Sequence, residues 1–198
     1  MKKKGVRSEM TYRLGAAVLV GGRSRRMGRP KESVVIEGDG RTFLEKICDE
    51  VDACINDHIC LRYLSVRKGQ KTGRDGYVSI EDKYDDIGPL GGIISVLERA
   101  GEDGLDAVLF LACDMIRYNS EEITSVCSRY KGEDILWART DGTDIQPLAS
   151  IYSTGIVKNL RNMADKGDYK LRDLEKYVKH TGFYDSNDAG LYMNVNSL

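Results

Sequence analysis

The segment at residues 106–112 constrains the fold of this chain more than any other part of its sequence. It reads DAVLFLA, so six consecutive apolar residues follow one aspartate. A strand that is apolar on both of its alternating faces must be covered on both sides, which is typical of a central strand in a parallel sheet between two helix layers. The segment therefore predicts an α/β protein with a three-layer α/β/α architecture.

Short aliphatic or β-branched runs alternate with longer segments of helical spacing along the rest of the chain. This alternation is typical of a mostly parallel sheet with crossover helices on both faces. The expected strands span residues 16–20, 58–64, 77–81, 106–112, 134–139, 147–152 and 191–195. The expected helices span residues 42–53, 88–100, 120–130, 155–164 and 170–178.

Two of these helices begin at recognisable capping residues. Thr42 stands three residues before Glu45, which is the spacing of a capping box. Either Asn119 or Ser120 can cap the third expected helix. No linker, repeat or low-complexity tract interrupts the sequence. We therefore expect one domain over residues 1–198, with residues 1–13 forming a flexible basic arm.

The overall charge and composition exclude several classes of protein. A formal net charge of −1 argues against a chain whose whole surface attracts nucleic acid or anionic lipid. The sequence has no run of about 18 apolar residues, the length of a membrane span, and no apolar core of a secretion signal follows its basic start. Five cysteines without a C-x-x-C pair indicate reduced thiols, and only two histidines argue against a zinc site. We expect a cytoplasmic protein that binds neither membrane nor nucleic acid.

A loop rich in glycine and cations follows the first expected strand. The segment VLVGGRSRRMGRPK, residues 18–31, holds three glycines and five cationic residues. Glycines let backbone N–H groups converge on a phosphate, and guanidinium groups suit its oxygens. Because ligands of open α/β sheets bind at the carboxyl ends of strands, this position favours a nucleoside triphosphate site over a solvated surface loop. The spacing matches neither the P-loop G-x-x-x-x-G-K-[ST] nor the dinucleotide motif G-x-G-x-x-G.

The same loop resembles a family signature. The segment LVGGRSRRMGRPK is similar to L-A-[GA]-G-x-(S)-x-R-M-G-x-x-K of nucleotidyltransferases that activate small phosphorylated molecules, with Val20 in place of the usual alanine. Within that group the chain most resembles the MobA-like molybdenum cofactor guanylyltransferases. Four later segments resemble the family in the same order, and they read DKYDDIGPLGGIISVLE, LFLACDM, DIQPLASIY and MNVNSL.

The resemblance implies a Rossmann-like nucleotidyltransferase fold with a mostly parallel central sheet, and a reaction that depends on Mg²⁺. In that reaction a terminal phosphate of the molybdopterin-type cofactor attacks the α-phosphorus of GTP, and pyrophosphate leaves. Gly21 and Gly22, together with the GPLGG segment, favour guanine as the base. The implied partners are GTP, the molybdopterin acceptor and, in transient contacts, proteins that deliver or accept the cofactor.

The resemblance also implies roles for individual residues. The residues expected to be catalytic are Lys31, Arg26 and Asp114, and Asp114 is also the expected metal ligand. The residues expected to bind the acceptor are Gln146, Pro147, Asn194 and Asn196. The residues expected to bind the nucleotide are Leu19, Val20, Gly21, Gly22, Arg23, Ser24, Met27, Gly28, Lys31, Asp82, Pro89, Leu90, Gly91 and Asp114.

Most of these assignments compete with an ordinary structural role. Asp114 can be a turn or helix-cap aspartate, and Asp82 can belong to a solvated acidic turn. Residues 89–91 must start a helix in any case. Asn194 and Asn196 occupy alternate positions of an expected strand, so they would point to the same face, but turn asparagines explain them too.

Several functions are compatible with the same loop. A cytidylyltransferase and a guanylyltransferase for cobinamide phosphate would share the fold and the chemistry, and a non-catalytic GTP-binding protein would share the loop alone. Arg62 stands near the place where the family has an asparagine after the second strand, which bears on contacts to the ribose or the base. Cys113 is expected to act as a small buried hydrophobe, and Met115 as a residue of the core or its rim.

Overall fold

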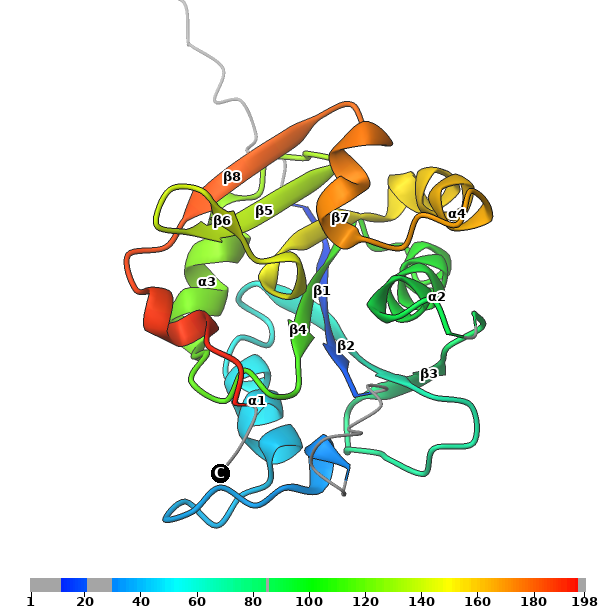
Figure 1. Cartoon of the computed structure of the whole chain (residues 1–198). Helices are drawn as coiled ribbons and strands as arrows, with labels where there is room; N and C mark the ends of the chain where they lie inside the picture. The colour runs from blue at the N-terminus through cyan, green and yellow to red at the C-terminus, as the bar shows by residue number, and fades with distance from the viewer. Residues whose placement is uncertain (1–11, 21–29, 85, 196–198) are drawn as a thin grey trace, which may run out of the picture.

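An eight-stranded sheet organises the protein (Figure 1). The computed structural model describes residues 12–20, 30–84 and 86–195. The strands follow one another in the spatial order β3-β2-β1-β4-β7-β5-β6, and β8 pairs with β5. Their bounds are β1 Leu14–Leu19, β2 Ile59–Val66, β3 Val78–Glu81, β4 Ala107–Ala112, β5 Ile135–Thr140, β6 Asp144–Ile145, β7 Ile151–Ser153 and β8 Thr181–Asp185.

The sheet is mostly parallel, as the sequence predicts. The pairs β1–β2, β2–β3, β1–β4 and β5–β8 are parallel. Strand β7 lies between β4 and β5 and is antiparallel to both, and β6 is antiparallel to β5. All six residues of β4 are buried, and β4 has a paired strand on each side. The prediction of a central, doubly covered strand is therefore confirmed.

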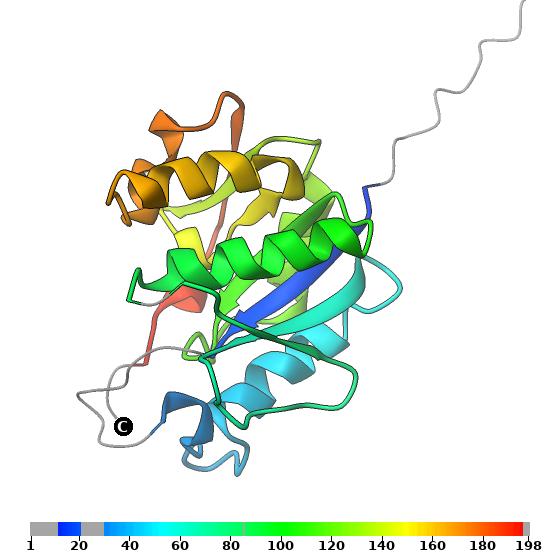
Figure 2. The same cartoon turned by 90° about the vertical axis from the view of Figure 1, so that its right-hand side faces the viewer.

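Helices cover both faces of the sheet. Helices α1 (Phe43–Asp52) and α3 (Ser120–Arg129) lie on one face, and α2 (Pro89–Glu102) and α4 (Val157–Asp165) lie side by side on the other (Figures 1 and 2). Alternate residues of β1 enter different cores, because successive side chains of a strand point to opposite faces. Val18 packs in the core under α1 and α3, whereas Ala17 packs in the core under α2 and α4. The three-layer prediction is confirmed.

The predicted helix caps are present. The Thr42 side chain accepts a hydrogen bond from the Glu45 backbone N–H, and the Glu45 carboxylate accepts one from the Thr42 backbone N–H. This reciprocal pair is the capping box of α1. Asn119 is the N-cap of α3, and its side chain accepts a hydrogen bond of 2.9 Å from the Glu122 backbone N–H. Each cap satisfies donors that the first helical turn leaves without an intrahelical partner.

The final strand differs from the prediction. Residues 191–195 do not form a strand, because Ala189–Tyr192 is a 3-10 helix capped by the Asp188 side chain. The last strand is β8, which the local pattern did not predict. The Asp134 carboxylate accepts hydrogen bonds from the backbone N–H groups of Lys179 and His180, and these bonds hold the start of β8 beside β5. Because they join residues 45 and 46 positions apart, no local pattern reports them.

Two other elements are shorter or tighter than predicted. The strand expected at residues 147–152 is confined to β7, because Pro147 begins a 3-10 helix and has no N–H to donate to a sheet. The helix expected at residues 170–178 is a 3-10 helix over Leu171–Lys176. Two further 3-10 helices span Lys31–Ser33 and Thr154–Ile156. In the part of the chain that the structure describes, we find no helix both long and apolar enough to cross a membrane.

Candidate active site at the carboxyl ends of the strands

Three parallel strands end together at one edge of the sheet. Leu19, the last residue of β1, is in register with Ser65 of β2 and with Ala112 of β4. Asp114 follows the end of β4 by two residues, and Asp82 comes directly after β3. The register therefore brings side chains from distant parts of the sequence to the edge where ligands of open α/β sheets bind.

Lys31 and Asp114 form an ion pair at this edge. The distance from Lys31 Nζ to Asp114 Oδ2 is 2.6 Å. The lysine side chain is 25% exposed and the aspartate side chain only 10% exposed, so the cation faces solvent more than its partner does. The sequence hypothesis requires these two residues to be close enough to share one nucleotide, and the structure meets that condition. Their roles in catalysis and metal binding stay predictions.

The backbone around Asp114 is held on two sides. The Cys113 N–H donates a hydrogen bond of 3.3 Å to the Leu19 carbonyl, and the Val195 N–H donates one of 3.1 Å to the Asp114 carbonyl. The first bond ties Asp114 to the end of β1, and the second ties it to the C-terminal segment. Burial, assisted by the nearby Asp114 carboxylate, raises the pKa of the Cys113 thiol to about 12, so Cys113 is not a nucleophile at neutral pH.

Asp82 is partly buried and hydrogen-bonded, unlike a residue of a fully solvated turn. Its Oδ1 accepts a hydrogen bond of 2.7 Å from the Ser65 hydroxyl. Burial raises the pKa of Asp82 above its usual value of 3.8, and the Ser65 hydrogen bond opposes that shift without cancelling it. Gly92 of α2 lies against this pair, because a Cβ there would be 2.3 Å from Ser65 Oγ and 3.1 Å from Asp82 Oδ1. The glycine lets α2 approach the strand ends closely.

Residues 89–91 form the first turn of α2, which is the structural role that the sequence also allows them. Pro89 occupies a position in the first turn, where a backbone N–H would have no intrahelical partner. The side chains of Leu90 and Val20 are buried in the core, with 0% and 1% exposure. Any contact of these two residues with a nucleotide must therefore come from their backbone atoms.

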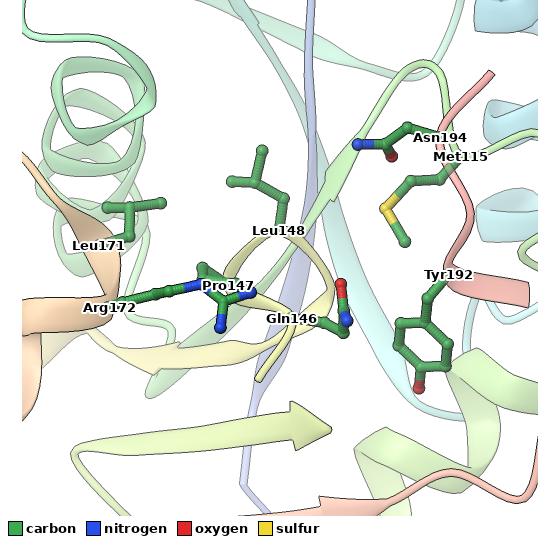
Figure 3. A pocket seen from close by; sticks show the side chains of 8 residues that line it. All are labelled: Met115, Gln146, Pro147, Leu148, Leu171, Arg172, Tyr192 and Asn194. Atoms are coloured by element: carbon green, nitrogen blue, oxygen red, sulfur yellow. The ribbon is translucent and has the colours of Figure 1, made fainter. Parts of the chain in front are cut away.

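A pocket of about 300 Å³ lies beside this edge (Figure 3). It contains three of the four predicted acceptor-binding residues, Gln146, Pro147 and Asn194, and in Figure 3 the Asn194 amide points into it. Gln146 and Pro147 precede Asn194 by 48 and 47 positions, so the structure brings residues of two separate sequence motifs into one pocket. The sequence interpretation did not assign the other lining residues to a site, and they are Met115, Leu148, Leu171, Arg172 and Tyr192.

One carboxylate binds both polar side chains on one side of the pocket. Asp144 accepts a hydrogen bond of 2.7 Å from Gln146 Nε2 and one of 2.8 Å from Arg172 Nη2. Arg172 lies on the 3-10 helix Leu171–Lys176, whose position in the sequence carries no motif. Its proximity to the DIQP segment could not be read from local patterns. The adjacent Leu171 and Leu148 supply the apolar part of the wall.

Part of the predicted site lies outside the described residues. This applies to the nucleotide-binding or catalytic predictions Gly21, Gly22, Arg23, Ser24, Arg26, Met27 and Gly28, and to the acceptor-binding prediction Asn196. The reason given for Asn194 and Asn196 facing the same way is wrong, because residues 193–195 are not in a strand. Asn194 nevertheless lines the pocket.

The donor set fits a magnesium ion that is shared with a substrate. Among the described residues, no three His, Cys, Asp or Glu side chains gather where they could hold a metal ion. Mg²⁺ commonly binds through one or two carboxylates, with substrate phosphates and water completing its octahedron. Asp114 supplies one such carboxylate at the end of β4, and it would hold the ion only together with a bound triphosphate.

Comparisons with known proteins agree with this architecture. A relative from Geobacillus sp., named probable molybdenum cofactor guanylyltransferase, is 27% identical over 194 residues that cover 93% of this chain and 94% of the relative. The crystal structure of molybdopterin-guanine dinucleotide biosynthesis protein A from Archaeoglobus fulgidus has a similar fold, with a TM-score of 0.72 at 19% identity over 92% of each chain.

A 4-diphosphocytidyl-2C-methyl-D-erythritol synthase from Anaerococcus prevotii has the same fold as well, with a TM-score of 0.68 at 12% identity over 96% of this chain and 92% of the other. The fold is therefore shared by proteins with different names, and the fold alone does not select the nucleotide. The model of the MobA-like NTP transferase domain matches residues 16–181, from β1 to the start of β8. This match spans the strand ends that carry Lys31, Asp82 and Asp114, and it shows that the chain belongs to the MobA-like nucleotidyltransferase family.

Proposed function

We propose that this protein is a molybdenum cofactor guanylyltransferase that transfers GMP from GTP to the terminal phosphate of molybdopterin. An oxygen of the acceptor phosphate forms a bond to the α-phosphorus of GTP, the bond to the β-phosphate breaks, and pyrophosphate leaves. The name of the Geobacillus sp. relative supports this reaction over others of the same fold. We place the protein in the cytoplasm, with transient partners that deliver or accept the cofactor.

One observation carries the proposal: the Lys31–Asp114 ion pair lies beside the pocket that contains Gln146 and Asn194. The Val195–Asp114 backbone hydrogen bond joins the two sites directly. A transfer between two phosphates requires both substrates to be held next to one cluster of charges, because the protein's task is to position them and to neutralise charge. The ion pair next to the pocket supports such a site for two substrates.

Lys31 and Asp114 would separate when a nucleotide binds. Asp114 would hold Mg²⁺, which would neutralise charge on the phosphates and on the leaving pyrophosphate. Lys31 would then exchange the carboxylate for phosphate oxygens, because its side chain is the more exposed of the pair. In a partly desolvated site a cation about 4 Å from a developing charge contributes a few kcal/mol, which is enough to affect the rate strongly.

The test is a transfer assay with each nucleoside triphosphate. Purified protein is incubated with molybdopterin, Mg²⁺ and either GTP or CTP, and pyrophosphate release is measured together with the dinucleotide product. We expect pyrophosphate and product with GTP and little of either with CTP. A preference for CTP would instead identify a cytidylyltransferase, a function that the shared fold with the Anaerococcus prevotii protein leaves open.

Two further functions would give different results in the same assay. A guanylyltransferase for another phosphorylated acceptor would release pyrophosphate from GTP with cobinamide phosphate but not with molybdopterin. A non-catalytic GTP-binding protein would bind GTP and release no pyrophosphate with either acceptor. Either result would replace the proposed reaction.

A further inference from the structure

A buried glutamate on α3 accepts hydrogen bonds from the hydroxyl groups of two tyrosines that lie in different parts of the chain. Glu122 is 8% exposed. Its Oε1 accepts a hydrogen bond of 2.6 Å from the Tyr192 hydroxyl, and its Oε2 accepts one of 3.1 Å from the Tyr184 hydroxyl. Tyr184 belongs to β8, whereas Tyr192 ends the 3-10 helix that leads into the C-terminal segment. A buried carboxylate needs such donors, so both bonds hold their elements against α3.

Tyr192 also belongs to the candidate acceptor pocket. Its side chain lines the pocket, yet in Figure 3 its hydroxyl points away from the pocket centre, in the direction of α3. Tyr192 is 5% exposed, and its ring packs edge to face on Tyr118, with ring centroids 5.2 Å apart. The hydroxyl therefore serves the fold of the chain, while the ring forms part of the pocket wall.

Two contacts bracket Asn194. On one side, Tyr192 is tied to Glu122 through its hydroxyl. On the other side, the Val195 N–H is bonded to the Asp114 carbonyl. Met193, which lies between these two anchored positions, is 57% exposed, and its hydrogen bonds are weak: its N–H donates to the Gly190 carbonyl at 3.4 Å, and Arg117 Nη1 lies 4.0 Å from its Sδ. The two shortest of these contacts, at Tyr192 and at Val195, therefore stand directly before and after Asn194 and its neighbour Met193.

We propose that Tyr192, held by Glu122, is a positioning residue for acceptor binding. The hydrogen bond fixes the short segment 192–195, and this segment sets the distance between the Asn194 amide in the pocket and the Asp114 carboxylate at the nucleotide site. Tyr192 does not take part in the chemical step. The inference rests on the proposed function, because it assumes that a phosphorylated acceptor occupies the pocket.

The experiment compares Tyr192→Phe with Tyr184→Phe as a matched control. Each variant removes one hydroxyl bond to the same carboxylate, but only Tyr192 leads into the pocket. For Tyr192→Phe we expect the KM for molybdopterin to rise about tenfold, the size of one lost hydrogen bond to a charged group, with little change in GTP affinity. Tyr184→Phe is expected to lose similar thermal stability and to keep the KM of the wild-type protein.

A second readout does not depend on activity. Hydrogen exchange of the C-terminal peptide that contains the Val195 amide should be faster in Tyr192→Phe than in Tyr184→Phe. Glu122→Gln, whose amide oxygen can still accept the Tyr192 hydrogen bond, should lie closer to wild type in KM and in exchange than Glu122→Ala does. This conservative variant separates the loss of the bond from a general loss of stability.

The outcomes distinguish the inference from the proposed function. Equal KM values and equal exchange rates for the two tyrosine variants would overturn the inference and leave a purely structural role for Tyr192. If the wild-type protein transfers no GMP to molybdopterin, the proposed function fails, and unaltered exchange in Tyr192→Phe would then overturn the positioning role independently.

Discussion

Lys31 and Asp114 share an ion pair but differ in their access to water. The Asp114 side chain is 10% exposed, and Lys31 can turn to solvent because its side chain is 25% exposed. Breaking such a pair costs little when the remaining partner stays hydrated, since ion pairs near the surface contribute about 1 kcal/mol or less. Asp114 can therefore be changed without unfolding the protein, because Lys31 stays hydrated, whereas removing Lys31 would leave the buried Asp114 carboxylate without this ion pair.

Asp114→Ala is predicted to fold normally and to lose Mg²⁺-dependent turnover. The melting temperature should stay near that of the wild type, because the lysine left behind has a 25% exposed side chain and stays hydrated. Transfer of GMP should fall by at least about a hundredfold, the usual effect of removing a group that organises transition-state charge. The measurement is pyrophosphate release at saturating Mg²⁺. A variant with wild-type activity would show the metal assignment to be wrong.

Gly92→Ala is predicted to destabilise the protein, because the new Cβ would lie 2.3 Å from Ser65 Oγ and 3.1 Å from Leu19 Cδ2. Ser65 is 1% exposed and bonded to Asp82, so it cannot move aside freely. We expect the free energy of unfolding to fall by about 1–3 kcal/mol, as for other overpacked sites. Denaturant unfolding measures this value.

The control for that prediction lies on the same helix. At Gly101 a Cβ would meet nothing closer than Thr154 Cβ at 3.8 Å. Gly101→Ala should therefore be neutral or stabilising by up to about 1 kcal/mol, since alanine favours the helix. Equal destabilisation by both substitutions would exclude close packing at Gly92 as the cause.

Asp82→Asn is predicted to change how stability depends on pH. The pKa of Asp82 is raised in the folded protein, so folding favours its neutral form. The contribution of Asp82 to stability is fully present below pH 3.8, the pKa of an ordinary aspartate, and it is lost as the pH rises through the higher pKa of the folded protein. Near pH 7 the asparagine variant, which can still accept the Ser65 hydrogen bond, should be more stable than wild type, and this advantage should disappear at about pH 3. Urea unfolding across that range is the measurement, and identical pH profiles would contradict the prediction.

Among the elements, the connection between β2 and β3 contacts the segment that carries Lys31. Gln70 Nε2 donates a hydrogen bond of 2.5 Å to Glu32 Oε1, and Gln70 Oε1 accepts one of 3.0 Å from the Arg67 backbone N–H. Glu32 directly follows Lys31 and is 9% exposed. The connection thus holds the 3-10 helix Lys31–Ser33 in place from the side of β2.

Gln70→Ala is predicted to weaken nucleotide binding without a large loss of stability. The tether to Glu32 disappears, so the Lys31 segment samples more positions and GTP affinity should fall roughly fivefold to tenfold, the effect of about one hydrogen bond. Calorimetric titration with GTP gives the affinity. Ser79→Ala removes the hydrogen bond between Ser79 of β3 and the Thr72 carbonyl of the same connection, a bond that involves neither Glu32 nor Lys31, and should leave affinity unchanged. Equal effects of both substitutions would contradict a specific tether.

For the whole molecule, the candidate site depends on a sheet that joins distant segments, so a ligand bound there should stabilise the entire fold. GTP with Mg²⁺ at about one hundred times its dissociation constant should add about 2.7 kcal/mol to the free energy of unfolding. A thermal-shift measurement should show a clear rise in melting temperature with GTP, a smaller one with CTP, and little change with GTP for Lys31→Ala. A larger shift with CTP would contradict the guanine assignment.

Much of the fold follows from local sequence patterns. The apolar run of β4, the alternation of strands and helices, and the caps at Thr42 and Asn119 each depend on residues that are near one another in the chain. Such patterns report which face of an element is buried, because side-chain periodicity is set by the backbone itself. The family signature around residues 19–31 is local in the same way, and it identified the class of enzyme.

The sequence by itself thus determined the layers, the order of the first four strands along the chain, and the nucleotidyltransferase family. Only the tertiary structure decided that β7 runs antiparallel inside the sheet, that β8 pairs with β5, and that Lys31 meets Asp114 across 83 positions. It also decided that Arg172 and Tyr192 join Gln146 and Asn194 around one pocket. These features depend on contacts between residues far apart in the sequence, and such contacts are settled by packing and long-range hydrogen bonds that no local periodicity encodes.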